Sequence, residues 1–373
     1  MKGVYVYNSL ECDCIHAGIE KKICDQITLF NRMGLVCRRI PNRDCKPFTL
    51  LWRVLMRLPL CPVCNDVMNT YLSDFDGLDF VYIRRRFISL QRFLTIRKIR
   101  KRNPNTKILY EIPTYPFKKE LTQRWVNYPL WWKECVYKKL LKRYIDRVVV
   151  VGNYENIDGI KAIPIVNGID INGMTPIHPA PEDGSIHIMA IANIEWWHGY
   201  DRFIKGLSQY YQSGGQRMIV LHLVGTGPTV PLLANQINKL GLNNYVIMHG
   251  YKSGDELDEI YNCCHLGLIS LATQDKDVYV HSTLKSRDYL AKGLPTMSTG
   301  MTDVFIGVDY KYNLELPMDA EIVDMNLVID FYDSIYGSMT REEVIAEIRA
   351  FAERTVDINI TMAPVVRYLK GEV

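Results

Sequence analysis

A chain of 373 residues, 48% of them hydrophobic, is too long for one ordinary core and too apolar for a disordered protein, so we expect two globular domains. Ten scattered cysteines favour reduced thiols, although Cys61 and Cys64 could hold a structural metal with Cys12 and Cys14. No segment has the apolar core of a signal peptide or the length of a membrane span. We therefore expect a cytoplasmic protein.

The net charge of +4 hides an asymmetry between the two halves of the chain. Residues 1–150 contain 29 Lys and Arg against 13 Asp and Glu, a net charge of +16, and the remaining residues carry −12. Trp52, Trp131 and Trp132 stand beside basic clusters, a pattern typical of surfaces that bind anionic lipid headgroups. An ordinary basic surface is the alternative. We expect no nucleic-acid partner, because no nucleic-acid-binding motif accompanies the charge.

The first half alternates short apolar strands with helices. A strand over 4–7 precedes a loop with His16 and Gly18, and a helix with apolar residues at helical spacing then runs to about Met33. A basic helix is expected over 89–102. Further strands are expected over 35–40, 80–83, 107–110 and 147–151, the last of which completes the first sheet. This order predicts a parallel sheet with helices on both faces.

Glu111 stands immediately after one of these expected strands. It begins the segment Glu-Ile-Pro-Thr-Tyr-Pro, in which two prolines forbid regular structure. A carboxylate at the C-terminal end of a buried strand lies where open α/β sheets bind ligands. A solvated or loop-bracing glutamate is the alternative.

The strand–helix pattern restarts near Asn167, where the sign of the charge also changes. Gly225-Thr-Gly227 follows a strand as a turn in which the backbone can approach a phosphate. Capping boxes at Ser253–Glu256 and Thr340–Glu343 predict two helix starts. Strands are expected over 186–192, 218–224, 245–249, 266–271 and 294–298, and helices over 200–211, 230–240 and 360–369.

One stretch in the C-terminal third carries the densest set of signals. Ser282 or Thr283 can cap a helix, and Gly293 occupies the left-handed position at its end. Lys285 and Asp288 share one side of this helix near its positive end. A cation, amide donors and a carboxylate one turn later suit a diphosphate with a ribose attached. An amphipathic helix with solvated charges explains the stretch, taken alone, equally well.

Four segments together resemble bacterial cell-surface glycosyltransferases of the two-Rossmann (GT-B) type, and the retaining family 4 most. They are Glu111 to Pro116, His198 to Arg202, Val224 to Pro228 and Thr283 to Pro295, and Pro164 to Asp170 is similar to the interdomain linker. The resemblance implies an α/β fold of two Rossmann-like parallel-sheet domains that face a cleft. Residues 1–165 would form the acceptor side, 166–355 would bind the nucleotide sugar, and 356–373 would pack back on the first domain.

The same resemblance implies a hexosyltransferase-type enzyme. It would move a sugar from a nucleotide-diphosphate donor to a lipid-linked or oligosaccharide acceptor of capsule or O-antigen synthesis, with retention, without metal or cofactor, at the inner membrane face. Glu111 and His16 would orient the acceptor hydroxyl, and Gly18 and Tyr115 would belong to the acceptor-side loop. The implied donor-binding residues are Asn193, His198, Gly199, Gly225, Gly227, Ser282, Thr283, Lys285 and Asp288.

Three positions depart from the family pattern. Asn193 and His198 stand where members usually carry an Arg and a Lys for the diphosphate, and Val280 replaces a Glu. Lys285 is the candidate for the missing cation. The departures motivate an alternative, a non-catalytic nucleotide-sugar-binding or scaffold subunit of the same fold. A double-Rossmann epimerase is less favoured, because the basic, Trp-rich first half suits a lipid acceptor.

Overall fold

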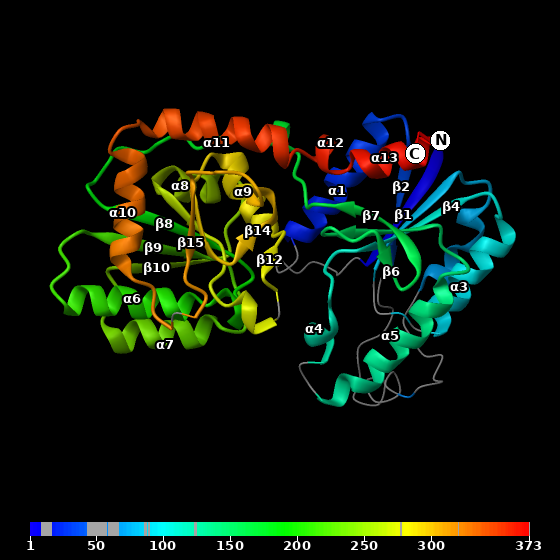
Figure 1. The fold of residues 1–373 in the computed structure, drawn as a ribbon, viewed down its shortest axis with the longest axis horizontal. Coiled ribbons are helices and arrows are strands. Elements are labelled where there is room, and N and C mark those ends of the chain that lie inside the picture. Colours follow the sequence, from blue (N-terminus) through cyan, green and yellow to red (C-terminus); the bar gives the residue numbers. More distant parts are fainter. Residues whose placement is uncertain are drawn as a thin grey trace. The chain divides into compact units, whose positions relative to one another are not determined.

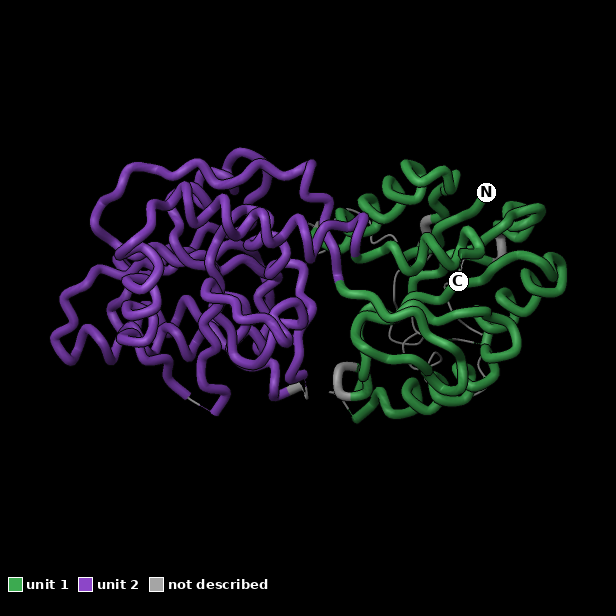
Figure 2. The backbone as a smooth tube through the Cα atoms, turned by 45° about the horizontal axis from the view of Figure 1, so that its top comes forward, with its two compact units in different colours: residues 1–166, 361–373 green, residues 167–360 purple. Residues whose placement is uncertain are grey.

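The computed structural model describes residues 1–8, 17–42, 58, 67–85, 88, 90–122, 125–276, 278–319 and 321–372. The chain divides into two compact units, unit 1 with residues 1–166 and 361–373 and unit 2 with residues 167–360 (Figure 2). Each contains a largely parallel sheet, so the expected pair of α/β domains is confirmed. Outside the described residues lie His16, Trp52 and the four cysteines considered for a metal, Cys12, Cys14, Cys61 and Cys64.

The sheet of unit 1 has seven strands in the order β2-β1-β3-β4-β5-β7-β6. They are β1 (Lys2–Asn8), β2 (Val36–Asn42), β3 (Phe80–Arg84), β4 (Lys107–Ile112), β5 (Arg147–Val151), β6 (Asn156–Ile157) and β7 (Ile160–Ile165). Only β6 runs antiparallel to its neighbour among these strands. The expectation that β5 completes the sheet was wrong, because β7 pairs with β5 along its length. The antiparallel hairpin of β6 and β7 returns the chain, so that β7 can pair with β5 without a crossover helix.

Helices cover both faces of the unit 1 sheet, with α1 and α13 on one side and α3 and α5 on the other (Figure 1). The helices are α1 (Ala17–Arg32), η2 (Val67–Phe75), α3 (Leu90–Arg102), α4 (Lys118–Thr122), η3 (Trp125–Asn127), α5 (Tyr128–Leu141) and α13 (Ala363–Lys370). Gly18 lies in the first turn of α1 and not in the preceding loop. Lys107 Nζ donates to the carbonyls of Tyr368 (2.9 Å) and Leu369 (2.8 Å), which fixes the end of α13 on this unit.

The sheet of unit 2 has six strands in the order β10-β9-β8-β11-β13-β15. They are β8 (Ile186–Ile191), β9 (Ile219–Val224), β10 (Val246–Gly250), β11 (Leu266–Leu268), β13 (Thr296–Thr299) and β15 (Asn313–Leu316). A separate pair consists of β12 (Val280–His281) and β14 (Met301–Thr302). The helices are η4 (Ile171–Gly173), η5 (Trp196–His198), α6 (Tyr200–Gln212), α7 (Val230–Leu240), α8 (Asp255–Cys263), η6 (Thr273–Lys276), α9 (Leu284–Lys292), η7 (Asp303–Phe305), α10 (Met325–Tyr336), α11 (Arg341–Thr355) and α12 (Ile358–Thr361).

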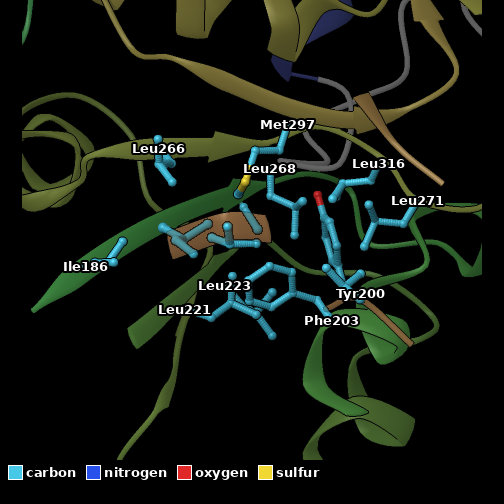
Figure 3. Packing of buried hydrophobic residues seen from close by; sticks show 14 of the residues in the cluster. Ile186, Tyr200, Phe203, Leu221, Leu223, Leu266, Leu268, Leu271, Met297 and Leu316 are labelled. Carbon is cyan, nitrogen blue, oxygen red and sulfur yellow. The ribbon is translucent and has the colours of Figure 1, made fainter. Parts of the chain in front are cut away.

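Apolar side chains from neighbouring strands and α6 form the core of unit 2. Leu221, Leu223 and Phe203 lie close together in Figure 3, and each is at most 1% exposed. Burying such a side chain stabilises the fold by about 1.5–3 kcal/mol. The strands therefore provide a rigid platform for the loops at their carboxyl ends.

The helix ends show which local signals decided the structure. Thr283 Oγ1 accepts from the amide of Ser286, and Gly293 adopts a φ of 86°, so the cap and the end predicted for α9 are confirmed. The box at Thr340 and Glu343 is confirmed too. The box at Ser253 was wrong, because Gly254 takes the N-cap position with a φ of 57° and α8 begins one residue later. Among the described helices, none combines the length and apolar character needed to cross a membrane.

Candidate functional site

The carboxyl ends of the strands of unit 2 bring most of the predicted donor residues to one edge of the sheet. Asn193 and His198 follow β8, Gly225 and Gly227 follow β9, and α9 begins near the segment that follows β11. In open α/β sheets this edge is where ligands bind. The candidate site is therefore built from loops held by three neighbouring strands.

The glycine turn after β9 is packed backbone to backbone against the turn after β8. A Cβ on Gly225 would lie 1.8 Å from the Ala192 carbonyl oxygen, and one on Gly227 would lie 2.2 Å from that of Ile194. The φ angles of 122° and 151° also favour glycine. The Gly225 amide donates to the Gly250 carbonyl at 2.7 Å, so this amide serves the fold itself.

The loop after β8 is braced by His198. The Glu195 amide donates to His198 Nδ1 at 2.9 Å, which leaves the ring proton on Nε2 in the neutral form. The ring stacks on Tyr200 at 5.4 Å, and Gly199 turns the chain into α6 with a φ of 63°. Asn193 Oδ1 is buried without a hydrogen-bond partner among the described residues. Such an acceptor is usually completed by a ligand or a water.

Lys285 reaches from the first turn of α9 to the carboxyl end of β11. Its Nζ donates to the Ile269 carbonyl (2.5 Å), Ser270 Oγ (3.2 Å) and Tyr200 Oη (3.1 Å). Burial lowers the pKa of Lys285 well below its usual value. A cation held among neutral oxygens can exchange one of them for an anion. Asp288, on the same helix, lies beside Tyr261, where its charge adds to burial in raising the pKa of that phenol.

Arg287, which was not among the predicted site residues, is 0% exposed. Its guanidinium donates to the Asn167 carbonyl (2.9 Å), Ser286 Oγ (2.9 Å), Ser282 Oγ (3.0 Å) and Asp303 Oδ1 (2.5 Å). Ser282 Oγ also accepts from the Asn167 amide at 3.0 Å. Ser282 is thus occupied within the fold, and Arg287 ties the start of α9 to the first residue of unit 2. Arg287 is one of several charged residues on this helix, so the sequence alone gave no sign that it would be buried and structural.

Glu111 lies inside β4 of unit 1 and is 0% exposed. Its Oε1 accepts from Lys22 Nζ (3.0 Å) and Arg84 Nη1 (2.7 Å), and its Oε2 lies 2.9 Å from the Tyr5 hydroxyl. Burial alone would raise the pKa of Glu111, but the charges of Arg84 and Lys22 outweigh it and lower the pKa to about 2. Glu111 is therefore ionised, and both of its oxygens have partners within unit 1.

Two other residues predicted on the acceptor side, Tyr115 and Gly18, are described in unit 1. The Tyr115 ring packs edge-on against Phe117 (6.1 Å) and Tyr154 (4.9 Å), with Lys138 Nζ 5.6 Å from its centre. Gly18 is exposed on α1. These residues and Glu111 belong to unit 1, whereas the predicted donor residues belong to unit 2.

Comparisons with known proteins identify the fold. No family model and no curated protein matches the chain. Among solved structures, HepE of Anabaena in complex with UDP and glucose matches with a TM-score of 0.64 and 14% identity over 100% of both chains. The lipopolysaccharide outer core galactosyltransferase WaaB (0.60, 14%) and sucrose-phosphate synthase from Thermosynechococcus elongatus (0.65, 12%) also match over 100% of both chains. At these identities the likeness shows the fold, GT-B, and the fold expected from the motifs is confirmed.

We predict that Arg287→Met destabilises unit 2 by about 3–5 kcal/mol, because the buried Asp303 carboxylate is left without its cation. Adding Asp303→Asn should recover part of the loss. Urea unfolding of both variants measures this. The exposed Arg354 serves as the control, since Arg354→Met should change stability by less than about 0.5 kcal/mol. Equal effects of the two arginine substitutions would contradict the assignment.

We predict that Glu111→Gln lowers the stability of unit 1 by about 3–5 kcal/mol at pH 7, since Lys22 and Arg84 would be buried without a counter-charge. The folded pKa of Glu111 is depressed, so its contribution is present above the unfolded pKa and is lost as pH falls from about 4.5 toward 2. The difference between variant and wild type should therefore narrow in acid. Glu155→Gln, at an exposed position, is the control, and a pH-independent gap would refute the prediction.

Proposed function

We propose that this protein is a glycosyltransferase that moves a sugar from a nucleotide-diphosphate donor to an oligosaccharide or lipid-linked acceptor of surface-polysaccharide synthesis. The carrying observation is a half-buried lysine, Lys285, whose Nζ is held by neutral oxygens in the first turn of α9 at the carboxyl edge of a GT-B sheet. The complex of HepE with UDP and glucose and the name of WaaB as a galactosyltransferase support a nucleotide-sugar donor and a hexosyl group.

The chemistry proposed for this edge is stabilisation of the departing diphosphate. The bond between the anomeric carbon and the diphosphate oxygen breaks, the acceptor oxygen bonds to that carbon, and the acceptor proton passes to the departing phosphate. Negative charge builds on the diphosphate, and Lys285 with the positive N-terminal end of α9 would stabilise it. Charge supplied in this way needs no metal ion. Retention, with both bonds on one face of the sugar, remains the proposal that the resemblance implies.

Each remaining residue has a proposed role that fits its place. Asn193 would complete its buried Oδ1 with a donor hydroxyl or water, and Asp288 would accept from the ribose. Glu111 would act by positioning, since β4 carries it directly into the segment that contains Tyr115. His16 remains a prediction for the acceptor hydroxyl.

A non-catalytic nucleotide-sugar-binding subunit is the second candidate. Asn193, His198 and Val280 favour it, because His198 braces its own loop and Val280 is an exposed apolar residue. Incubation with candidate nucleotide sugars and membrane extract separates the two candidates. Release of nucleoside diphosphate that depends on the extract supports the transferase, and binding without release supports the second candidate.

We predict that Lys285→Met weakens nucleoside diphosphate binding by about tenfold or more, the equivalent of a charge-assisted hydrogen bond of roughly 1.5–3 kcal/mol. The free energy of unfolding should stay equal or rise, because burial of the ammonium is unfavourable, as its lowered pKa indicates. Calorimetric titration with UDP and other nucleoside diphosphates is the measurement. Lys292→Met, at the other end of α9, is the matched control and should bind as wild type. Unchanged affinity in Lys285→Met would remove Lys285 from the site.

We propose that unit 1 attaches peripherally to an anionic membrane through one face of η3 and α5. Trp125, Tyr128 and Trp132 recur at helical spacing and are 81%, 55% and 53% exposed. The exposed face continues toward the C-terminal end of the helix with Lys139 and Arg143. Exposed aromatic rings beside cations fit the boundary between headgroups and acyl chains. A lipid-linked acceptor would be reached from such a surface at the inner leaflet.

We predict that Trp125→Ser with Trp132→Ser weakens binding to vesicles of phosphatidylglycerol and phosphatidylcholine by about tenfold, since two indoles leave the interface. Raising the salt concentration should weaken wild-type binding further, because each Lys or Arg near the surface contributes roughly 1 kcal/mol that ions screen. Sedimentation measures both effects. Trp196→Ser, at a 43% exposed tryptophan of unit 2, is the control. Equal binding by all three proteins would exclude this face of α5.

A further inference from the structure

Three histidines on neighbouring strands of unit 2 form a continuous hydrogen-bonded chain, and none of them is used by the proposed reaction. His187 of β8 and His222 of β9 are joined from Nδ1 to Nε2 at 2.8 Å, and His222 and His249 of β10 from Nδ1 to Nε2 at 2.9 Å. His187 Nε2 lies 3.1 Å from the nearer carboxylate oxygen of Asp183, which anchors the first ring. A fourth histidine contacts these three, because His265 Nδ1 accepts a hydrogen bond from the His187 backbone amide at 3.0 Å.

The positions of the ring protons follow from the anchor. An ionised Asp183 can only accept, so His187 Nε2 carries a proton, and the same logic places protons on Nε2 of His222 and His249. Each neutral ring then donates through Nε2 and accepts through Nδ1. The three rings can bind one added proton without losing a hydrogen bond, because it can occupy His249 Nδ1 or pass to another ring as the protons shift along the links. A second added proton leaves two N–H groups facing each other in one of the two ring-to-ring hydrogen bonds, and that bond is lost.

In acid, three free histidines each bind one added proton, whereas the three linked rings accept only one between them. The linked rings therefore bind at least two protons fewer. His265 adds to this deficit, because its Nδ1 can accept from His187 only while unprotonated. The pKa values agree in direction: burial lowers the pKa of His222 to about 3 and that of His265 to about 4, and it lowers the pKa of His249 as well. With folded values below the unfolded value of about 6.5, the stabilisation is complete above that pH and is lost as pH falls.

The groups that face the chain come from several elements. The carboxylates of Glu182 and Asp183 favour protonation of the nearby histidines, whereas the positive charges of Arg341 and Lys252 oppose it. Arg341 Nη1 lies 3.1 Å from Glu182 Oε1, so part of the acidic charge is already neutralised. The rings of Tyr332 and Tyr336 pack against His265. A small cavity gives water access to one end of the chain; it is lined by Glu182, Asp183, His187, Cys263, His265 and Arg341.

The element that protons can release most easily is β10. It is an edge strand of the sheet and carries His249 at a point where its register with β9 shifts, between Met248 and Gly250. Edge strands have one neighbour to lose, and local opening costs less than unfolding of the whole unit. The next residue, Gly250, holds the Gly225 amide through its carbonyl at 2.7 Å. Opening of β10 would therefore remove this hydrogen bond from the glycine turn of the candidate donor site, which the turn after β8 still holds.

We propose that the histidine chain is a pH-responsive latch on β10, which holds the strand at neutral pH and releases it in mild acid together with its hydrogen bond to the glycine turn. Release of β10 stands independently of the proposed reaction. Only its consequence for donor binding rests on the proposed function.

Native-state hydrogen exchange of the full chain, without any donor, tests the latch between pH 5 and 8. Below about pH 6, the protection of amides in β10 and of Leu221, which donates to the Tyr245 carbonyl, should fall by about tenfold per pH unit, because release of β10 breaks the link between His222 and His249 and lets one more proton bind. Ile269, whose amide donates to β13, should lose less. Protection of β10 that does not depend on pH, after correction for intrinsic exchange, would overturn the proposal.

His249→Gln is the informative variant, because an amide side chain can donate and accept but does not titrate here, so β10 would carry no titrating ring. The protection of β10 in this variant should depend little on pH, whereas His178→Gln, at an exposed histidine of the same unit, should keep the wild-type slope. If His249→Gln does not fold, titration of the wild-type histidine ring signals by NMR replaces it. An ordinary midpoint near 6.5 for His222, with β10 still protected, or a wild-type slope in His249→Gln, would contradict the latch.

Discussion

A buried guanidinium holds the candidate donor site of this protein in place. Arg287 is fully buried, and it binds the Asn167 carbonyl, two serine hydroxyls and the Asp303 carboxylate at once. A charge in such a place is tolerated only when its donors are satisfied. The start of α9, from which Lys285 reaches the strand ends, is therefore fixed by a residue with no proposed contact to the substrate.

Unit 1 also contains a buried charge, and here it is negative. Glu111 carries a negative charge into the core, and Lys22 and Arg84 surround it from α1 and β3. In both units a buried, ion-paired residue binds a segment far away in the chain: Glu111 binds Lys22 in unit 1, and Arg287 binds the Asn167 carbonyl in unit 2. Lys285 differs from both, because it is half-buried and its Nζ partners are neutral oxygens, and this difference is the reason for the proposal that it binds an anion.

Local signals in the sequence determined the secondary structure and the fold class. The cap at Thr283, the glycine that ends α9 at Gly293 and the box at Thr340 depend on residues at most a few positions apart, so the chain carries them in readable form. Alternating apolar strands and helices likewise predicted two parallel sheets. Gly225 and Gly227 were recognised as a turn, and their φ angles and close backbone packing agree with that reading.

Only the tertiary structure decided which charged and polar residues have partners. Arg287 meets Asn167, and Glu111 meets Lys22 and Arg84, across long stretches of chain. The addition of β7 to the first sheet and the chain of histidines across three strands depend in the same way on pairing between distant segments. A single sequence records the residues and their spacing, but burial and distance arise only when strands and helices pack. The tertiary fold therefore assigned the structural roles that spacing along the chain left open.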